Sequence, residues 1–177
     1  MEQFTITVFS ENKTGLLSRV VSVFTRRHIN IDSLAVSRSS IEGIHRFTIV
    51  VMVDEDMIKH LVAQLDKQVD VIKAFYYRNE EMVYQEIALY KIPADSLSSS
   101  GLTETVIRKF HARILEINAE FIVLEKTGHP DETEALRIQL EKTGIYEFSR
   151  SGRIAIARPM EKLNTYLKTF QEQVSTH

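Results

Sequence analysis

Four polar or small residues lie close together just before the first amphipathic stretch of the chain: Asn12, Thr14, Gly15 and Ser18. Their spacing places them in a turn that leads into a helix. The first turn of a helix has backbone N–H groups without intrahelical partners and a partial positive charge. The turn therefore predicts a site for a small carboxylate ligand, such as an amino acid. An ordinary capped helix start would give the same pattern.

Other residue types that carry out chemistry are not spaced for it. No two of the six histidines lie three or four residues apart and the chain has no cysteine, so we expect neither a helical zinc pair nor a thiolate metal site. The chain has six glycines and no glycine-rich loop of the types that cradle phosphates. The sequence therefore favours binding or regulation over catalysis.

Composition narrows the class of partner. The net charge is −2, which argues against a general nucleic-acid binder, because such proteins carry a basic excess. No apolar run approaches the length of a membrane span. The residues after Met1 enter a strand pattern directly, without the features of a signal peptide. We expect a soluble cytoplasmic protein with no membrane or nucleic-acid partner.

The polar turn needs a strand before it and a helix after it, and the first half of the chain supplies both. The alternation Phe4, Ile6, Val8 predicts a strand, and an apolar stripe predicts a helix that carries Arg26 and Arg27 in its last turn. The expected strands are 3–9, 29–37, 45–53 and 69–78, and the expected helices are 14–27 and 54–67. The order is βαββαβ, with 45–53 central in the sheet and Asp54 as a helix N-cap.

The same order recurs in the second half. The expected strands are 82–92, 113–118 and 120–126, with a strand or hairpin at 145–158, and the expected helices are 103–112 and 132–141. A last amphipathic helix carries the stripe Leu163, Leu167, Phe170 and Val174. The fold class is therefore α+β, with two ferredoxin-like sandwiches in tandem, over residues 1–79 and 80–177. An RNA-recognition sheet of this order would need exposed aromatics, for which Phe47 alone is poor support.

Several segments resemble one protein family. The segments ENKTGLLSRVVSVFTRRHINIDSL, HRFTIVV and KQVDVIKAF resemble an ACT domain, and EIALYKI and EFSRSGRIAIAR resemble the domain that follows it in the small regulatory subunit of acetolactate synthase. The resemblance covers nearly the whole chain except the last helix. It implies that the N-terminal sandwich is an ACT domain that binds a ligand and dimerises. Small sandwiches also expose sheet edges, which is a second reason to expect a homodimer.

The resemblance implies a regulatory function in the biosynthesis of valine, leucine and isoleucine. Family members lack a catalytic centre, activate the catalytic large subunit and confer feedback inhibition by valine. Thiamine diphosphate, magnesium and FAD belong to the large subunit, so no cofactor or metal is expected on this chain. Residues 82–158 would dock the large subunit or transmit the valine signal.

The resemblance also suggests which residues line a valine site at the ACT dimer interface. The family positions correspond to Asn12, Gly15, Ser18 and Asn30, with backbone N–H groups from Thr14 to Leu17 for the carboxylate. Two apolar residues, Leu16 and Ile31, could wall the pocket for the side chain of the ligand. Leucine and isoleucine could compete, because one methylene changes a binding free energy by only about 1–3 kcal/mol.

Two features leave alternatives open. The family usually has Gly-Tyr where this chain has His28-Ile29, so His28 would have to adopt a left-handed conformation beside the ligand site. The cluster Arg150, Arg153 and Arg158 is either a docking surface or solvated charge. The alternative functions are a free-standing amino-acid sensor of the ACT type with another target, or a small enzyme with an unrecognised site.

Overall fold

The computed structural model describes residues 1–97 and 102–159. The chain forms two compact units. The first unit contains residues 1–83 and the segment that begins at Ala155, and the second unit contains Tyr84–Ile154. The chain therefore leaves the first unit and later returns to it, whereas the sequence predicted one boundary between residues 79 and 80.

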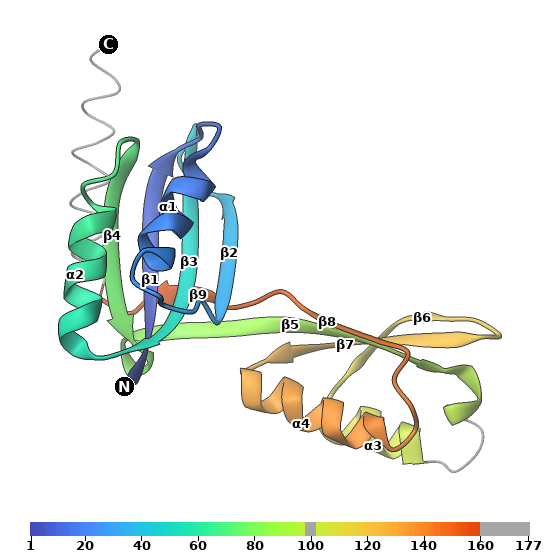
Figure 1. The fold of residues 1–177 in the computed structure, drawn as a ribbon. Helices are drawn as coiled ribbons and strands as arrows, with labels where there is room; N and C mark the ends of the chain where they lie inside the picture. Colours follow the sequence, from blue (N-terminus) through green and yellow to red (C-terminus); the bar gives the residue numbers. More distant parts are fainter. Residues whose placement is uncertain (98–101, 160–177) are drawn as a thin grey trace. The chain divides into compact units, whose positions relative to one another are not determined.

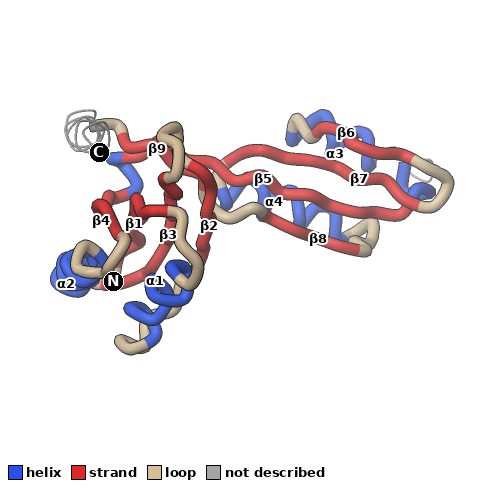
Figure 2. The backbone as a smooth tube through the Cα atoms, turned by 90° about the horizontal axis from the view of Figure 1, so that it is seen from above, coloured by secondary structure: helices blue, strands red, loops and turns tan. Residues whose placement is uncertain are grey.

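The first unit is an antiparallel sheet with two helices on one face (Figure 1; Figure 2 from above). The sheet order is β2-β3-β1-β4. Its elements are β1 (Glu2–Glu11), α1 (Leu16–Thr25), β2 (Ser33–Arg38), β3 (Ile44–Val53), α2 (Glu55–Leu65) and β4 (Val71–Arg78). The prediction that residues 45–53 form a central strand is confirmed, because β3 lies between β2 and β1.

Alternating apolar residues build the core of the first unit. Phe4, Ile6 and Val8 of β1 are fully buried against the helices. Ile6 is paired with Ile49 of β3, so the apolar sides of both strands face the same way. The N-cap prediction for α2 is confirmed, since the Asp54 carboxylate accepts a hydrogen bond from the Met57 N–H at 2.8 Å.

The helix α1 ends earlier than predicted. The His28 N–H donates to the Thr25 carbonyl and the Ile29 N–H donates to the Phe24 carbonyl, both at 3.1 Å. This pair of bonds is a Schellman motif, and His28 has the left-handed conformation that the motif requires, with φ 54°. The prediction that Arg26 and Arg27 lie in the last turn is wrong, because Arg26 is already the C-cap.

The strand β2 begins at Ser33 rather than at residue 29. Ile29 and Ile31 alternate with polar residues because they pack against the core, not because they pair in the sheet. The first sheet is also buried on the face opposite the helices, where Thr5, Thr48 and Phe75 are at most 8% exposed.

The second unit repeats the strand order of the first. Its sheet runs β6-β7-β5-β8. The strand β9 also pairs with β5, and both strands cross between the units, because β5 begins in the first unit and β9 returns to it at Ala155. A short 3-10 helix, η1 (Asn79–Glu81), precedes β5. The elements are β5 (Met82–Pro93), η2 (Ala94–Leu97), α3 (Leu102–Phe110), β6 (Arg113–Ile117), β7 (Phe121–Gly128), α4 (Pro130–Glu141), β8 (Glu147–Arg150) and β9 (Ile154–Ala157). The predicted α+β class with two ferredoxin-like sandwiches is confirmed.

The region 145–158 forms no hairpin. β8 and β9 both pair with β5, and they are separated by Ser151, Gly152 and Arg153. Gly152 has φ 74°, which redirects the chain at this break. The smaller core of this unit is formed by Ala88, Tyr90, Ile92, Ile122, Leu124, Leu136 and Leu140. The predicted last helix lies outside the described residues.

Candidate ligand-binding site

The start of α1 lacks a side-chain cap. Gly15 is the N-cap residue, with φ 81°, and no side chain of the described residues accepts a hydrogen bond from the first turn. The Leu16 N–H makes a long bond of 3.4 Å to the Lys13 carbonyl. The N–H groups of Leu17 and Ser18 have no acceptor among the residues that the structure describes. Two donors at the positive end of a helix are therefore available to an anion.

Gly15 leaves the approach to these donors open. A Cβ atom built on Gly15 would meet no atom within 4 Å. Glycine is thus favoured here by the positive φ angle and not by lack of space. A ligand can reach the backbone of this turn from solvent, as the predicted carboxylate site demands.

Two other turns hold the loop before the helix, residues 12–15, from either side. The Asn12 N–H donates to the Gly43 carbonyl at 2.9 Å, and the Glu11 N–H donates to the Asp70 carbonyl at 2.9 Å. The Asp70 carboxylate accepts from Lys13 Nζ at 2.8 Å. These contacts fix the loop at the end of the sheet where β1 ends.

The hydrogen bond between Lys13 and Asp70 also shifts the pKa values of both side chains. It lowers the pKa of Asp70 below its usual value, with further lowering from the nearby charges of Lys13 and Arg19. It raises the pKa of Lys13 to about 12, together with a contribution from Glu11. The pair is therefore fully charged near neutral pH.

The predicted residues of the first turn divide into exposed and buried positions. Asn12, Thr14, Gly15 and Ser18 are exposed, and Leu17 is 48% exposed. The side chain of Leu16 is only 3% exposed and belongs to the core. The exposed neighbour Leu17 is better placed than Leu16 to contact the apolar part of a ligand.

Asn30 and Ile31 follow the C-terminal end of α1, whereas the 12–15 loop precedes its first residue. The ten residues of α1 span about 15 Å at 1.5 Å per residue. Asn30 is exposed, whereas Ile31 is half-buried against the core. One copy of the chain therefore does not bring these two residues to the 12–15 loop.

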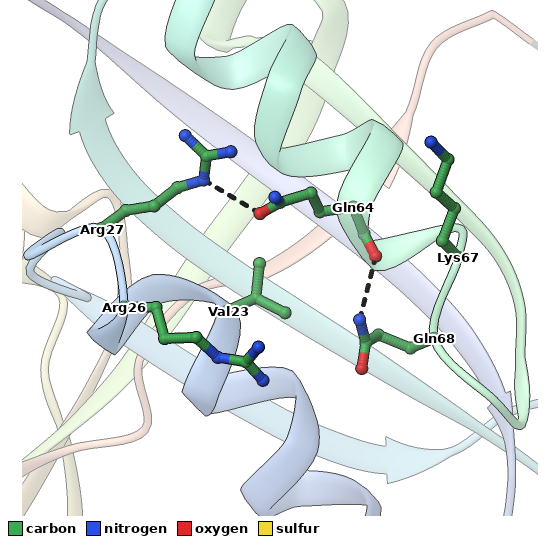
Figure 3. A pocket seen from close by; sticks show the side chains of 6 residues that line it. All are labelled: Val23, Arg26, Arg27, Gln64, Lys67 and Gln68. Carbon is green, nitrogen blue, oxygen red and sulfur yellow. Dashed lines mark hydrogen bonds between the residues drawn. The ribbon is translucent and has the colours of Figure 1, made fainter.

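A separate basic groove lies between α1 and α2 (Figure 3). Its volume is about 470 Å³ and its lining includes Arg26, Arg27 and Lys67 but no carboxylate. Arg27 Nε donates to Gln64 Oε1 across the groove at 2.9 Å. The groove is electropositive, but none of the predicted ligand residues lines it.

The predicted arginine cluster of the second unit is not simply solvated charge. Arg153 is 4% exposed and its guanidinium lies 3.8 Å from the centre of the Tyr84 ring. Burial lowers the pKa of Arg153, while Tyr84 and Glu86 oppose that shift. Arg150 forms an ion pair with Glu134 at 2.7 Å. These two arginines are thus committed to contacts within the unit.

The second sheet has an open face. A hollow of about 550 Å³ lies over it, lined by Ile87, Leu89, His111, Arg113, Leu115, Glu125 and Thr127. Ile87 is 40% exposed, Leu89 38% and Leu115 47%. Apolar side chains surrounded by charged ones are typical of protein interaction surfaces.

The described residues lack two further features. Within residues 1–97 and 102–159, no three His, Cys, Asp or Glu side chains are grouped so as to hold a metal ion. None of the helices in those ranges is long and apolar enough to cross a membrane.

Two family models match the chain. Residues 6–73 match the AHAS small subunit-like ACT domain, and residues 85–159 match the small subunit of acetolactate synthase. The acetolactate synthase small subunit of Mycolicibacterium smegmatis is 37% identical over 87% of this chain and 90% of that protein. The Bacillus subtilis small subunit is 34% identical over 93% of this chain and 95% of that protein.

A solved structure of an acetolactate synthase small subunit also matches the chain. The crystal structure of the acetolactate synthase small subunit from Thermotoga maritima covers 90% of this chain and 99% of its own, with a TM-score of 0.82 and 27% identity. Sequence matches in both halves and a structural match over nearly the full length agree with the resemblance in the sequence. The chain belongs to the acetolactate synthase small-subunit family.

Proposed function

We propose that this chain is a regulatory subunit without a catalytic centre of its own. It binds and activates the catalytic large subunit of acetolactate synthase and makes that enzyme sensitive to valine. Thiamine diphosphate, magnesium and FAD would all be held by the large subunit. Relatives named as small subunits over nearly the whole chain support the partnership with a large subunit.

The observation that carries the valine site is the uncapped start of α1 at Gly15. The N–H groups of Leu17 and Ser18 would bind the carboxylate of valine. The amide oxygens of Asn12 and Asn30 would accept hydrogen bonds from its ammonium group. Leu17 and Ile31 would contact the branched side chain.

The separation between Asn30 and the 12–15 loop supports a site built by two copies of the chain. A valine molecule is far shorter than α1, so one copy cannot supply both groups of contacts. β2 is the edge strand on the side of the sheet next to α1 (Figure 1) and exposes Val36, at 41%. Antiparallel pairing of β2 with its symmetry mate would set Asn30 of one copy near the 12–15 loop of the other.

The open face of the second sheet is the surface that we assign to the large subunit. Its exposed Ile87 and Leu89 offer apolar contact, and Arg113 and Glu125 supply a polar rim. The proposal therefore gives valine binding to the first unit and partner binding to the second.

The test is acetolactate production by a purified large subunit from the same source, with and without this chain and with increasing valine. Activation by the chain, followed by inhibition with valine, is the expected result. If the chain binds valine but leaves acetolactate production unchanged, the chain is a free-standing sensor with another target. Turnover by the chain alone would contradict a non-catalytic role.

A further inference from the structure

Asp70 has an uncommon backbone conformation beside the 12–15 loop. It is the residue immediately before β4, and its φ angle of 71° lies in the left-handed region that costs most non-glycine residues free energy. Its side chain is only 11% exposed, although it carries a charge. A carboxylate with so little exposed surface keeps its charge where cationic partners surround it.

Asp70 contacts three residues at the candidate ligand site, although it lies more than 50 residues away from each of them in the chain. The backbone carbonyl of Asp70 accepts from the Glu11 N–H at 2.9 Å. One carboxylate oxygen accepts from Lys13 Nζ at 2.8 Å, within the 12–15 loop. The other accepts from an Arg19 guanidinium nitrogen at 2.7 Å, in the first turn of α1. The same residue therefore holds both ends of the Gly15 turn.

We propose that Asp70 is a positioning residue for the amino-acid ligand. This inference rests on the proposed function of the Gly15 turn. Asp70 fixes the loop and the first helical turn relative to each other, so that the free N–H groups of Leu17 and Ser18 keep one geometry before the ligand arrives.

The physical gain is preorganisation. A loop that is ordered before binding loses less conformational entropy on binding than a mobile one. Charge-assisted hydrogen bonds are stronger than neutral ones, and Asp70 makes two of them to groups on either side of Gly15. Neutralising Asp70 weakens both bonds together and releases the loop.

The test variant is Asp70→Asn, because asparagine tolerates the left-handed conformation and preserves the size of the side chain. Valine binding is measured by calorimetry on the full chain, and valine inhibition is measured on the complex with the large subunit. Coupling through a positioning contact changes affinity by about five- to tenfold, so the dissociation constant and the half-inhibiting concentration should rise by that factor. Activation of the large subunit at zero valine should not change.

The matched control is Asp66→Asn. Asp66 is a carboxylate in the same α2–β4 connection that binds Lys73 Nζ at 2.5 Å and the Ala74 N–H at 2.6 Å, but it does not touch the 12–15 loop. It should lower thermal stability without changing valine affinity. Equal effects of the two variants on valine affinity would overturn the positioning role. Tighter valine binding by Asp70→Asn would also overturn it, because released Lys13 and Arg19 would then be attracting the ligand.

A ligand-free measurement separates this inference from the proposed function. Hydrogen–deuterium exchange without valine should show faster exchange in residues 12–18 of Asp70→Asn than in the wild type or in Asp66→Asn. If the wild type fails to bind valine, the proposed function fails, and the exchange rates still decide whether Asp70 holds the loop. Unchanged exchange in Asp70→Asn contradicts the clamp even where valine binds normally.

Discussion

The two units share a strand order and even a helix ending, but they treat the second face of the sheet differently. His28 after α1 and His111 after α3 both have left-handed φ angles, 54° and 52°. In each case the next residue donates to a carbonyl five residues back, from Ile29 to Phe24 and from Ala112 to Ile107. The helices α1 and α3 therefore end with the same backbone geometry.

The faces opposite the helices differ. In the first unit this face is closed, with Thr5, Thr48 and Phe75 nearly inaccessible. In the second unit the corresponding face exposes Ile87 and Leu89 at about two-fifths of their surface, 40% and 38%. The comparison teaches that one topology can serve two purposes, because the fold fixes the helical side of the sheet and leaves the other side free to differ.

The prediction with the largest expected effect concerns valine binding by the first unit. Gly15→Asp should abolish valine inhibition while leaving activation of the large subunit intact, because a carboxylate at this turn repels the carboxylate of the ligand. Aspartate tolerates a left-handed φ better than most residues, so folding should survive. The measurement is a valine titration of acetolactate production.

The control for that variant is Gly15→Asn, which is neutral and of similar size. It should keep a weakened valine response. Normal valine inhibition in Gly15→Asp would refute a valine site at this turn. The first unit would then have no proposed ligand with which to contrast the partner surface of the second unit.

The next prediction concerns binding of the large subunit by the second unit. Leu89→Glu places a charge on the open sheet face, and burying it against a partner should raise the concentration of this chain needed for half-maximal activation by about tenfold or more. Activity titrations with the large subunit measure this shift. Ile138→Glu, on the 48% exposed position of α4, is the control for a charge on the helical side. Equal effects of the two substitutions would remove the special role of the open face.

A prediction with a smaller expected effect compares one buried hydroxyl group in each unit, Thr133 on α4 and Thr7 on β1. The Thr133 hydroxyl donates to the buried carboxylate of Glu86, so Thr133→Val should destabilise the protein by about 1.5–3 kcal/mol. The buried Thr7 hydroxyl has no hydrogen-bond partner among the described residues, so Thr7→Val should be neutral or stabilising. Urea denaturation of both variants gives the two free energies of unfolding.

Thr127→Val is the matched reference for this pair. Its hydroxyl donates to Glu125 at 2.6 Å on an exposed surface, so its loss should cost less than about 0.5 kcal/mol. A loss as large as that of Thr133→Val would show that burial is not what makes the Glu86 contact strong.

The prediction with the smallest expected effect tests whether the ends of α1 and α3 are energetically equivalent. His28→Gly and His111→Gly should each stabilise the protein by about 0.5 kcal/mol, since relief of left-handed strain outweighs the extra freedom of glycine in the unfolded chain. Thermal denaturation measures both. Stabilisation by only one of them would show that the two endings are not energetically equivalent.

Much of the fold follows from local pattern. The period-two alternation of Phe4, Ile6 and Val8 and the helical spacing around Val20 each report on one buried face. The strand predictions were wrong where the same local pattern can arise from two different structures. Ile29 and Ile31 alternate like a strand but pack against the core, and the alternation at 145–158 does not reveal that both pieces pair with β5.

The site was predicted less completely than the fold. Gly15 and its turn could be identified because the glycine and the following apolar stripe are adjacent in the sequence. Gly43 and Asp70, which hold the turn from both sides, lie far from it in the chain, and no local pattern indicates such contacts. Leu16 was expected to face a ligand, but its place in the helical stripe directs it into the core.

The double crossing of the chain between the units determines how the protein can be divided. A fragment that stops at Asn79 would lose the Ala155 carbonyl, which accepts a hydrogen bond from the guanidinium of the half-buried residue Arg46. The first domain is therefore assembled from two separated stretches of the gene. Excision of residues 84–154, with a short turn joining Val83 to Ala155, would preserve it better than truncation, because the Ala155 carbonyl would remain and so would the hydrogen bond from the Arg158 N–H to the Glu81 carbonyl at 2.8 Å.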